Sequence, residues 1–157
     1  HDDSKEDELI IGGDVKGIDY KLAKCCNPIF GDDIFGFVST EGTIKIHRKD
    51  CPNARHIYSR YRYRVVNARW SGKMGSKYVC VLRVVGNDDI GIVTNITSII
   101  SKEKNIYMRN ISIDSNDGLF QGHITVMVDD TSSLNSLIKK LKTVKGVKDV
   151  QRSSINC

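Results

Sequence analysis

The stretch YVCVLRVVGNDDIGIVTNITSIISKEK, residues 78–104, predicts the first two elements in the second half of this 157-residue chain. Its first part, YVCVLRVV, is rich in valine and predicts a β-strand. The part from Asp88 onward predicts a helix with Asp88 or Asp89 near its start, because apolar side chains recur at the spacing of one helix face. These side chains are Ile92, Val93, Ile96, Ile99 and Ile100. A strand followed by an amphipathic helix indicates a domain in which helices pack on a sheet.

The residues that follow complete a βαββαβ order. Two strands are predicted at NIYMRNISID (105–114) and LFQGHITVMVD (119–129), on either side of the turn SNDG. A second helix is predicted at TSSLNSLIKKLK (131–142), with Thr131 as its N-cap, and a last strand at VKDVQRS (147–153). This order predicts a ferredoxin-like unit, a four-stranded antiparallel sheet with two helices on one face.

The first half of the chain predicts a smaller, β-rich domain. DIFGFV (33–38) and TIKIH (43–47) form a hairpin around STEG, whose Gly42 suits a tight turn. RVVNARW predicts a third strand, and CPNARHIYSRY (51–61) a short helix with Pro52 at its first position. The predicted divisions are a flexible acidic linker at 1–13, the small domain at 14–71, a linker at 72–77 and the second domain at 78–157.

Charge is distributed unevenly along the chain, whose net charge is +5. Residues 20–77 carry twelve basic and four acidic side chains, a net charge of +8, whereas residues 1–19 carry a net charge of −5. The most basic segment is also the one that carries the paired cysteines. This coincidence indicates a polyanionic partner.

Targeting signals are not evident. No apolar run approaches the roughly 18 residues that a membrane span needs. The start, HDDSKEDEL, lacks the basic and apolar regions of a signal peptide. Five cysteines without an export signal favour reduced thiols or metal ligands over a disulfide framework. We therefore expect a cytoplasmic protein with no membrane partner.

Three thiols and an imidazole in one short span suit a tetrahedral zinc site: Cys25, Cys26, His47 and Cys51. Alternation along the strand places His47 on its polar face beside Lys45, away from the core. A metal would also stabilise a domain with a modest core. Adjacent cysteines chelate less well than C-x-x-C, so one of the pair can ligate while the other packs. The alternatives are buried cysteines with a surface histidine, a redox switch, or a cysteine nucleophile, for which no third catalytic group is evident.

Basic residues are interleaved with tyrosines in HRKDCPNARHIYSRYRYR, residues 47–64. Guanidinium groups pair with phosphates, and tyrosine rings stack on unpaired bases. If its end is extended, Arg60, Arg62 and Arg64 share one face of a strand. The candidate RNA-binding residues are Arg48, Lys49, Arg55, Arg60, Tyr61, Arg62, Tyr63 and Arg64. The alternative is a solvated charged face.

Taken together, YKLAKCCNPIFGDDIFGFVSTEGTIKIHRKDCPNA (20–54) resembles the small Cys/His domain in the C-terminal regulatory half of RelA/SpoT-family (Rel) stringent-response proteins. The βαββαβ unit, with DDIGIV at its first strand–helix turn, is similar to the ACT domain that follows this module in the family. The resemblance covers about residues 9–157. It implies an α+β fold in which a β-rich, zinc-finger-like Cys/His domain precedes a ferredoxin-like ACT domain.

The resemblance implies a regulatory function. The family's complete enzymes make and degrade ppGpp and pppGpp, but nothing in this chain resembles their catalytic half, so no catalytic residue is predicted. In such proteins this region senses deacylated tRNA on a stalled ribosome and controls the catalytic domains. The implied partners are ribosomal RNA, deacylated tRNA and the catalytic domains of the same chain.

An amino-acid-sensing or dimerising ACT module is the second hypothesis. ACT domains commonly bind small ligands near the first strand–helix turn, often at a homodimer interface. That turn contains Asp89, Ile90 and Gly91, and the glycine would let a ligand approach the backbone. A plain helix start is the alternative for this turn. The uneven charge favours RNA binding, because an amino-acid sensor needs no segment with a net charge of +8.

Overall fold

The computed structural model describes residues 9–12, 19–71 and 77–154, which form two compact units. One unit is Lys77–Ser153, and the other contains the described residues before it. The linker predicted at 72–77 lies outside the described residues except for Lys77. The same holds for residues 1–8 and 13 of the linker predicted at the N-terminus. Each unit is described by itself.

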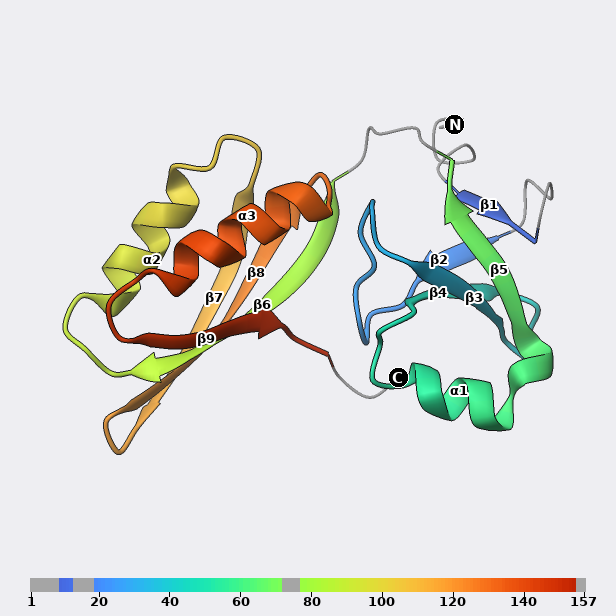
Figure 1. The fold of residues 1–157 in the computed structure, drawn as a ribbon, viewed down its shortest axis with the longest axis horizontal. Coiled ribbons are helices and arrows are strands. Elements are labelled where there is room, and N and C mark those ends of the chain that lie inside the picture. Colours follow the sequence, from blue (N-terminus) through green and yellow to red (C-terminus); the bar gives the residue numbers. More distant parts are fainter. Residues whose placement is uncertain (1–8, 13–18, 72–76, 155–157) are drawn as a thin grey trace. The chain divides into compact units, whose positions relative to one another are not determined.

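The first unit contains a five-stranded sheet in the order β1-β5-β3-β4-β2 (Figure 1). Its strands are β1 (Leu9–Ile11), β2 (Tyr20–Leu22), β3 (Ile34–Val38), β4 (Ile44–Arg48) and β5 (Val65–Trp70). β2 runs parallel to β4, and the other pairs are antiparallel. The predicted hairpin is confirmed, since Gly42 adopts a φ of 89° and its N–H donates to the Ser39 carbonyl oxygen at 3.1 Å.

The linker predicted at residues 1–13 is wrong for Leu9–Ile11, which form β1. These residues pair with β5, where Leu9 lies opposite Trp70 and Ile11 opposite Ala68. Leu9 and Ile11 are buried, with Ile10 between them half-buried. The acidic residues around Leu9–Ile11 led to the prediction of a linker. The strand is only three residues long, and its pairing with the distant β5 stabilises it.

The sheet of the first unit is buried on both faces. One face packs Leu9, Ile11, Ile34, Ile44 and Ile46. The other packs Ala23, Cys25, Cys26, Phe35, Cys51, Ala54 and Ile57. The prediction that His47 lies on a polar face is therefore wrong, because this side chain is only 1% exposed. Helix α1 (Ala54–Arg60) and the cysteine-bearing turn contribute the residues that bury that face.

Helix α1 confirms the short helix predicted after Cys51. Its N-cap is Asn53, so Pro52 lies two residues before the helix and not at its first position. A 3₁₀ helix, η2 (Arg62–Arg64), follows at once and leads into β5.

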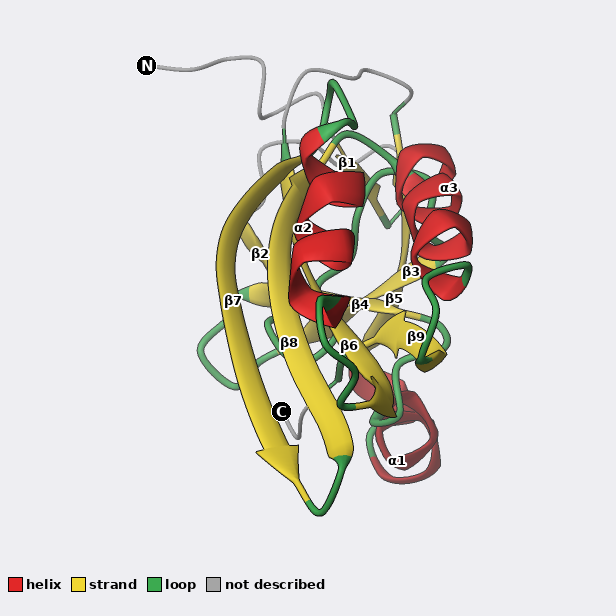
Figure 2. Ribbon diagram, turned by 90° about the vertical axis from the view of Figure 1, so that its left-hand side faces the viewer, coloured by secondary structure: helices red, strands yellow, loops and turns green. Residues whose placement is uncertain are grey.

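The second unit confirms the βαββαβ order. Its elements are β6 (Tyr78–Asn87), α2 (Ile92–Ser101), β7 (Tyr107–Asn116), β8 (Leu119–Val128), α3 (Thr131–Lys142) and β9 (Val147–Arg152). The antiparallel sheet has the order β7-β8-β6-β9, and both helices lie on one of its faces (Figure 2). α2 begins only at Ile92, because Gly91, its N-cap, adopts a left-handed φ of 84°.

Alternate residues of the two central strands face the helices and form the core of the second unit. Leu82 of β6 lies opposite Ile124 of β8, and Cys80 opposite Val126. Leu82, Val84, Ile124 and Val126 are fully buried. Of the stripe predicted for α2, Ile92, Ile96 and Ile100 are buried, whereas Val93 is 36% exposed. α3 contributes the buried Leu134, Leu137 and Leu141. Cys80 is 1% exposed and belongs to this core.

The N-cap of α3 is Asp130 and not the predicted Thr131. Asp130 has extended backbone, and its Oδ1 accepts a hydrogen bond from the Ser133 N–H at 2.8 Å. Asp130→Ala should therefore lower the free energy of unfolding of the second unit by about 1 kcal/mol. Thr131→Ala should change the free energy of unfolding by only about a few tenths of a kcal/mol. Urea unfolding measures the stability of both variants. Equal losses for the two variants would contradict the assignment of the cap.

Candidate functional site

The paired cysteines lie in a turn that follows β2. The Asn27 N–H donates to the Ala23 carbonyl oxygen at 2.9 Å and closes a helix-like turn around Cys25 and Cys26. The Ala23 N–H donates to the Ile46 carbonyl oxygen at 2.8 Å and attaches this turn to β4. Successive side chains diverge by about 100° in a helical turn but by about 180° in a strand. Both sulfurs therefore reach the same cluster, although adjacent cysteines are a poor chelate in extended chain.

His47 and Cys51 come from β4 and from the turn after it. The Cys51 N–H donates to the Arg48 carbonyl oxygen at 3.0 Å, so the chain turns back toward His47. The Cys51 carbonyl oxygen then accepts the Ala54 N–H at 2.9 Å, at the first residue of α1. The β3–β4 hairpin and the turn before α1 thus bring His47 and Cys51 close to the two adjacent cysteines.

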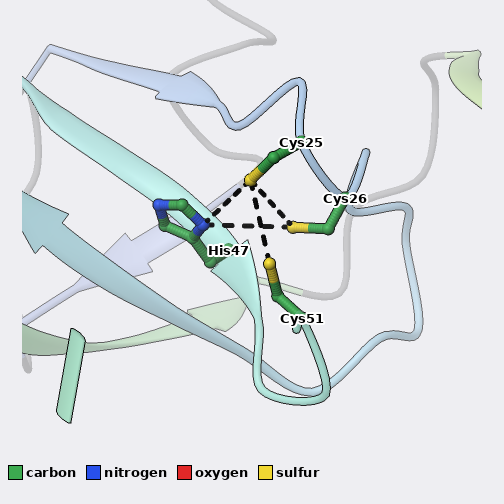
Figure 3. Close-up of side chains that lie close together, drawn as sticks. All are labelled: Cys25, Cys26, His47 and Cys51. Carbon is green, nitrogen blue, oxygen red and sulfur yellow. Dashed lines mark hydrogen bonds between the residues drawn. The ribbon is translucent and has the colours of Figure 1, made fainter. Parts of the chain in front are cut away.

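The four side chains converge on one point (Figure 3). The Cys25 sulfur lies 3.6 Å from His47 Nδ1, 3.7 Å from the Cys51 sulfur and 4.0 Å from the Cys26 sulfur. All four ligand atoms lie within 4.8 Å of one another. A tetrahedral zinc ion with Zn–S of about 2.3 Å and Zn–N of about 2.0 Å separates sulfurs by about 3.8 Å and sulfur from nitrogen by about 3.6 Å. The observed spacing fits a metal ion of this size.

Hydrogen bonds to the sulfurs also suit an anionic cluster. The Cys26 sulfur accepts the backbone N–H of Arg48 at 3.4 Å, and the Cys51 sulfur accepts from Asn53 Nδ2 at 3.8 Å. Such donors stabilise thiolate ligands. Asn53 is not among the site residues predicted from the sequence, where its only signal is its position two residues after a candidate ligand.

Burial shifts the pKa values of two members of the cluster. It raises the pKa of the Cys26 thiol to about 11, against the smaller opposing effect of the Arg48 backbone hydrogen bond. Burial, together with the smaller effect of the Lys45 charge, lowers the pKa of His47 to about 4. At neutral pH the imidazole is therefore neutral, as a ligand must be, while the Cys26 thiol keeps a proton that a metal would displace.

The cluster is closed to solvent. Its four side chains are between 1% and 4% exposed, and a site without an open position is typical of structural metals. Cys26 and Cys51 are free thiols, whereas Cys25 is disulfide-bonded in the structure. Metal binding by all four side chains therefore requires Cys25 in its reduced form. With that condition, the donor set and its spacing can hold a metal ion.

The end of the basic run is helical, so the condition under which its arginines would share one face of a strand is not met. Arg60 ends α1 and Arg62–Arg64 form η2, so the three arginines do not share one face of a strand. Its exposed members are Lys49, Arg55, Arg60, Arg62 and Tyr63. RNA binding by these residues stays a prediction.

Three other members of the predicted set make contacts within the unit. Arg48 is 6% exposed, and its Nη1 lies 3.3 Å from Asp50 Oδ1. Arg64 donates from Nε to the Val38 carbonyl oxygen at 2.8 Å. Tyr61 is half-buried. These side chains are less available to a partner than the sequence pattern indicates.

The predicted amino-acid site lies in the turn between β6 and α2. Ile90 is fully exposed there, and Gly91 is the N-cap of α2. A surface hollow of about 540 Å³ lies elsewhere on the second unit, where it is lined by residues that include Arg83, Asp114 and Lys148. Asp89, Ile90 and Gly91 do not line this hollow. Amino-acid binding at the turn stays a prediction.

No helix within the described parts of the chain combines the length and apolar character that crossing a membrane requires.

Two family models match the chain one after the other. The model described as the RelA/SpoT RIS domain matches residues 9–71. The model described as the ACT domain matches residues 74–152. The two matches fall on the cysteine-bearing unit and on the βαββαβ unit.

Curated relatives are similar to the chain over most of its length. The GTP pyrophosphokinase of Escherichia coli K12 is 31% identical over 150 residues, 95% of this chain and 20% of that protein. The bifunctional (p)ppGpp synthase/hydrolase RelA of Mycobacterium tuberculosis is 31% identical over 137 residues, 87% of this chain and 18% of that protein. The chain thus spans about a fifth of the length of these relatives. Among solved structures, the ACT domain from GTP pyrophosphokinase of Chlorobium tepidum is 34% identical, with a TM-score of 0.46 over 49% of this chain and 99% of that one.

Proposed function

We propose that this chain, which belongs to the RelA/SpoT family, is a zinc-stabilised regulatory region that binds RNA. It comprises the RIS domain of the family followed by an ACT domain. The observation that carries the proposal is the closed Cys₃His cluster beside a helix with exposed arginines. The RNA is deacylated tRNA on a ribosome. Its binding controls (p)ppGpp synthesis and hydrolysis by the parts of the longer relatives that this chain does not span.

Zinc is the metal that this donor set favours. Three thiolates and one imidazole in tetrahedral spacing suit Zn²⁺, whereas Mg²⁺ and Ca²⁺ prefer oxygen ligands. The hydrogen-bond donors to the Cys26 and Cys51 sulfurs support thiolate ligands. The zinc would hold the cysteine turn, β4 and the entry to α1 together.

Purified, fully reduced chain should contain one zinc per molecule. Elemental analysis measures the metal, and thiol titration counts the cysteines that become reactive when a chelator removes it. Cys80, which is buried in the other unit, should remain unreactive until that unit unfolds. Reduced protein that holds no metal, and whose Trp70 fluorescence is unchanged by the chelator, would contradict the zinc assignment.

Exposed positive charge supports the RNA proposal. Arg55 and Arg60 project from α1, Arg62 from η2, and none makes an ion pair within the described residues. The neighbouring Tyr63 is 81% exposed, which is unusual for a large aromatic ring. Guanidinium groups that bind phosphates beside a ring that stacks on a base form a common RNA contact.

The double variant Arg60→Ala/Arg62→Ala should weaken binding to deacylated tRNA. Removing two phosphate contacts should also lower the slope of log affinity against log salt concentration by up to about two. Fluorescence anisotropy at several salt concentrations measures both quantities, and co-sedimentation with ribosomes extends the test to the proposed complex.

The matched control is Lys139→Ala/Lys142→Ala, which removes the same charge from exposed positions on α3. It should leave the affinity and the slope close to those of the parent chain. If both double variants lose affinity equally, the binding follows net charge and the α1–η2 surface is not its site.

A further inference from the structure

His47 is held between two phenylalanines of β3. Phe35 lies directly opposite His47 in the β3–β4 register, and the two rings stack with centroids 5.4 Å apart and an angle of 15°. Phe37 meets the same imidazole edge-on, with centroids 6.4 Å apart and an angle of 74°. These contacts restrict the ring to an orientation in which Nδ1 faces the sulfurs of Cys25 and Cys26.

Phe37 is covered in turn by the end of the basic run. The Arg64 guanidinium carbon lies 4.5 Å from the centroid of the Phe37 ring, within the range of a cation–π contact. Tyr61 meets the same ring edge-on at 6.0 Å. The Arg64 hydrogen bond to the Val38 carbonyl oxygen fixes the guanidinium to β3. Phe37 therefore lies between a metal ligand and η2.

α1 and η2 together carry the exposed side chains that are proposed to bind RNA. α1 has only seven residues, no side-chain capping bond at Asn53 and no acidic residue in its first turn. A helix this short is stabilised mainly by packing. Its packing partners include the ligands themselves, because Ala54 and Ile57 lie in one cluster with the cysteines.

We infer that Phe37 positions His47 in the metal site and that Arg64 and Tyr61 connect the basic segment to it, so that RNA bound at residues 60–64 strengthens the hold on the metal. Linkage requires the converse, that metal binding strengthens RNA binding by the same factor. The inference rests on the proposed function, since it needs both a metal and an RNA.

The first test compares Phe37→Leu with Phe30→Leu, in which the same substitution is made beside Trp70 and away from the cluster. Loss of a residue that orients a ligand should lower zinc affinity about tenfold in Phe37→Leu. Chelator competition measures this affinity. Phe30→Leu should leave it within about twofold of the parent. The visible absorption of cobalt-substituted protein should shift only in Phe37→Leu, because it reports the ligand geometry and not global stability.

The second test measures the zinc affinity by competition with a chelator at equilibrium, with and without saturating deacylated tRNA. The RNA should raise the zinc affinity of the parent chain by about fivefold or more, and this factor should shrink in Phe37→Leu. Zinc taken up by the RNA alone is measured separately and subtracted. If Phe37→Leu does not fold, Arg64→Met replaces it, since it removes the cation and the hydrogen bond to Val38 but leaves the ring.

Two results would overturn the inference. One is an equal loss of zinc affinity in Phe37→Leu and Phe30→Leu with unchanged cobalt spectra, which would make Phe37 a packing residue only. The other is a zinc affinity that RNA does not raise, although the RNA binds through Arg60 and Arg62. That second result leaves the proposed function standing. Failure of the zinc-loaded chain to bind RNA at all would instead contradict the proposed function.

Discussion

Replacing His47 with alanine is expected to abolish metal binding and to unfold the first unit while the second stays folded. Structural zinc contributes about 10–16 kcal/mol to the folding of small zinc domains, and whole domains are stable by only about 5–15 kcal/mol. Loss of one of four ligands leaves three thiols buried in a cluster that can no longer hold the ion. A unit with a small core has little else to offset this loss.

Trp70 makes the measurement specific to one unit. It is the single tryptophan of the chain and lies in β5, where its Nε1 donates to the Asp32 carbonyl oxygen at 2.9 Å. Its emission should report unfolding of the first unit, and far-UV circular dichroism should retain the signal of the second. His56→Ala is the matched control, since His56 is exposed on α1 and outside the cluster. A His47→Ala protein that keeps native Trp70 emission and stability would show that the cluster is packing and not a metal site.

The second large effect is expected in the second unit, from Gly86→Ala. Gly86 lies where the β6–β9 register shifts, and a Cβ atom there would collide with the Gly146 carbonyl oxygen and approach Val147 Cα to 2.9 Å. Both obstacles are backbone atoms, so neither can turn aside as a side chain does. We expect a loss of about 3 kcal/mol or more in the free energy of unfolding, at the upper end of overpacking effects.

Gly122→Ala is the graded control for this prediction. A Cβ atom at Gly122 would approach the Phe120 ring to 3.2 Å, which a small rotation of that ring relieves. Its cost should be about 1 kcal/mol. Urea unfolding followed by circular dichroism measures both variants, and Trp70 emission should stay native in each. A Gly86→Ala variant no less stable than Gly122→Ala would show that the β6–β9 backbone gives way easily.

Local periodicity made the second unit predictable element by element. The helix predicted at residues 131–142 coincides with α3, and the apolar stripe predicted from Ile92 to Ile100 contributes buried residues of α2. Apolar residues recur every three to four positions on a helix face and every second position on a strand face. A short stretch of sequence is therefore enough to predict each element. The helix ends were less accurate, because Asp130 rather than Thr131 caps α3 and Gly91 delays the start of α2.

The βαββαβ order, the family resemblance and the four candidate ligands were predictable from the sequence alone. That the ligands meet, that His47 is buried and that Arg48 and Arg64 turn inward follows only from the folded unit. The physical reason is that alternation shows which side of a strand a residue faces, but not whether that side is covered. The cover on the His47 face comes from the turn at residues 23–27 and from α1, which are remote from each other in the chain and approach only in the folded unit.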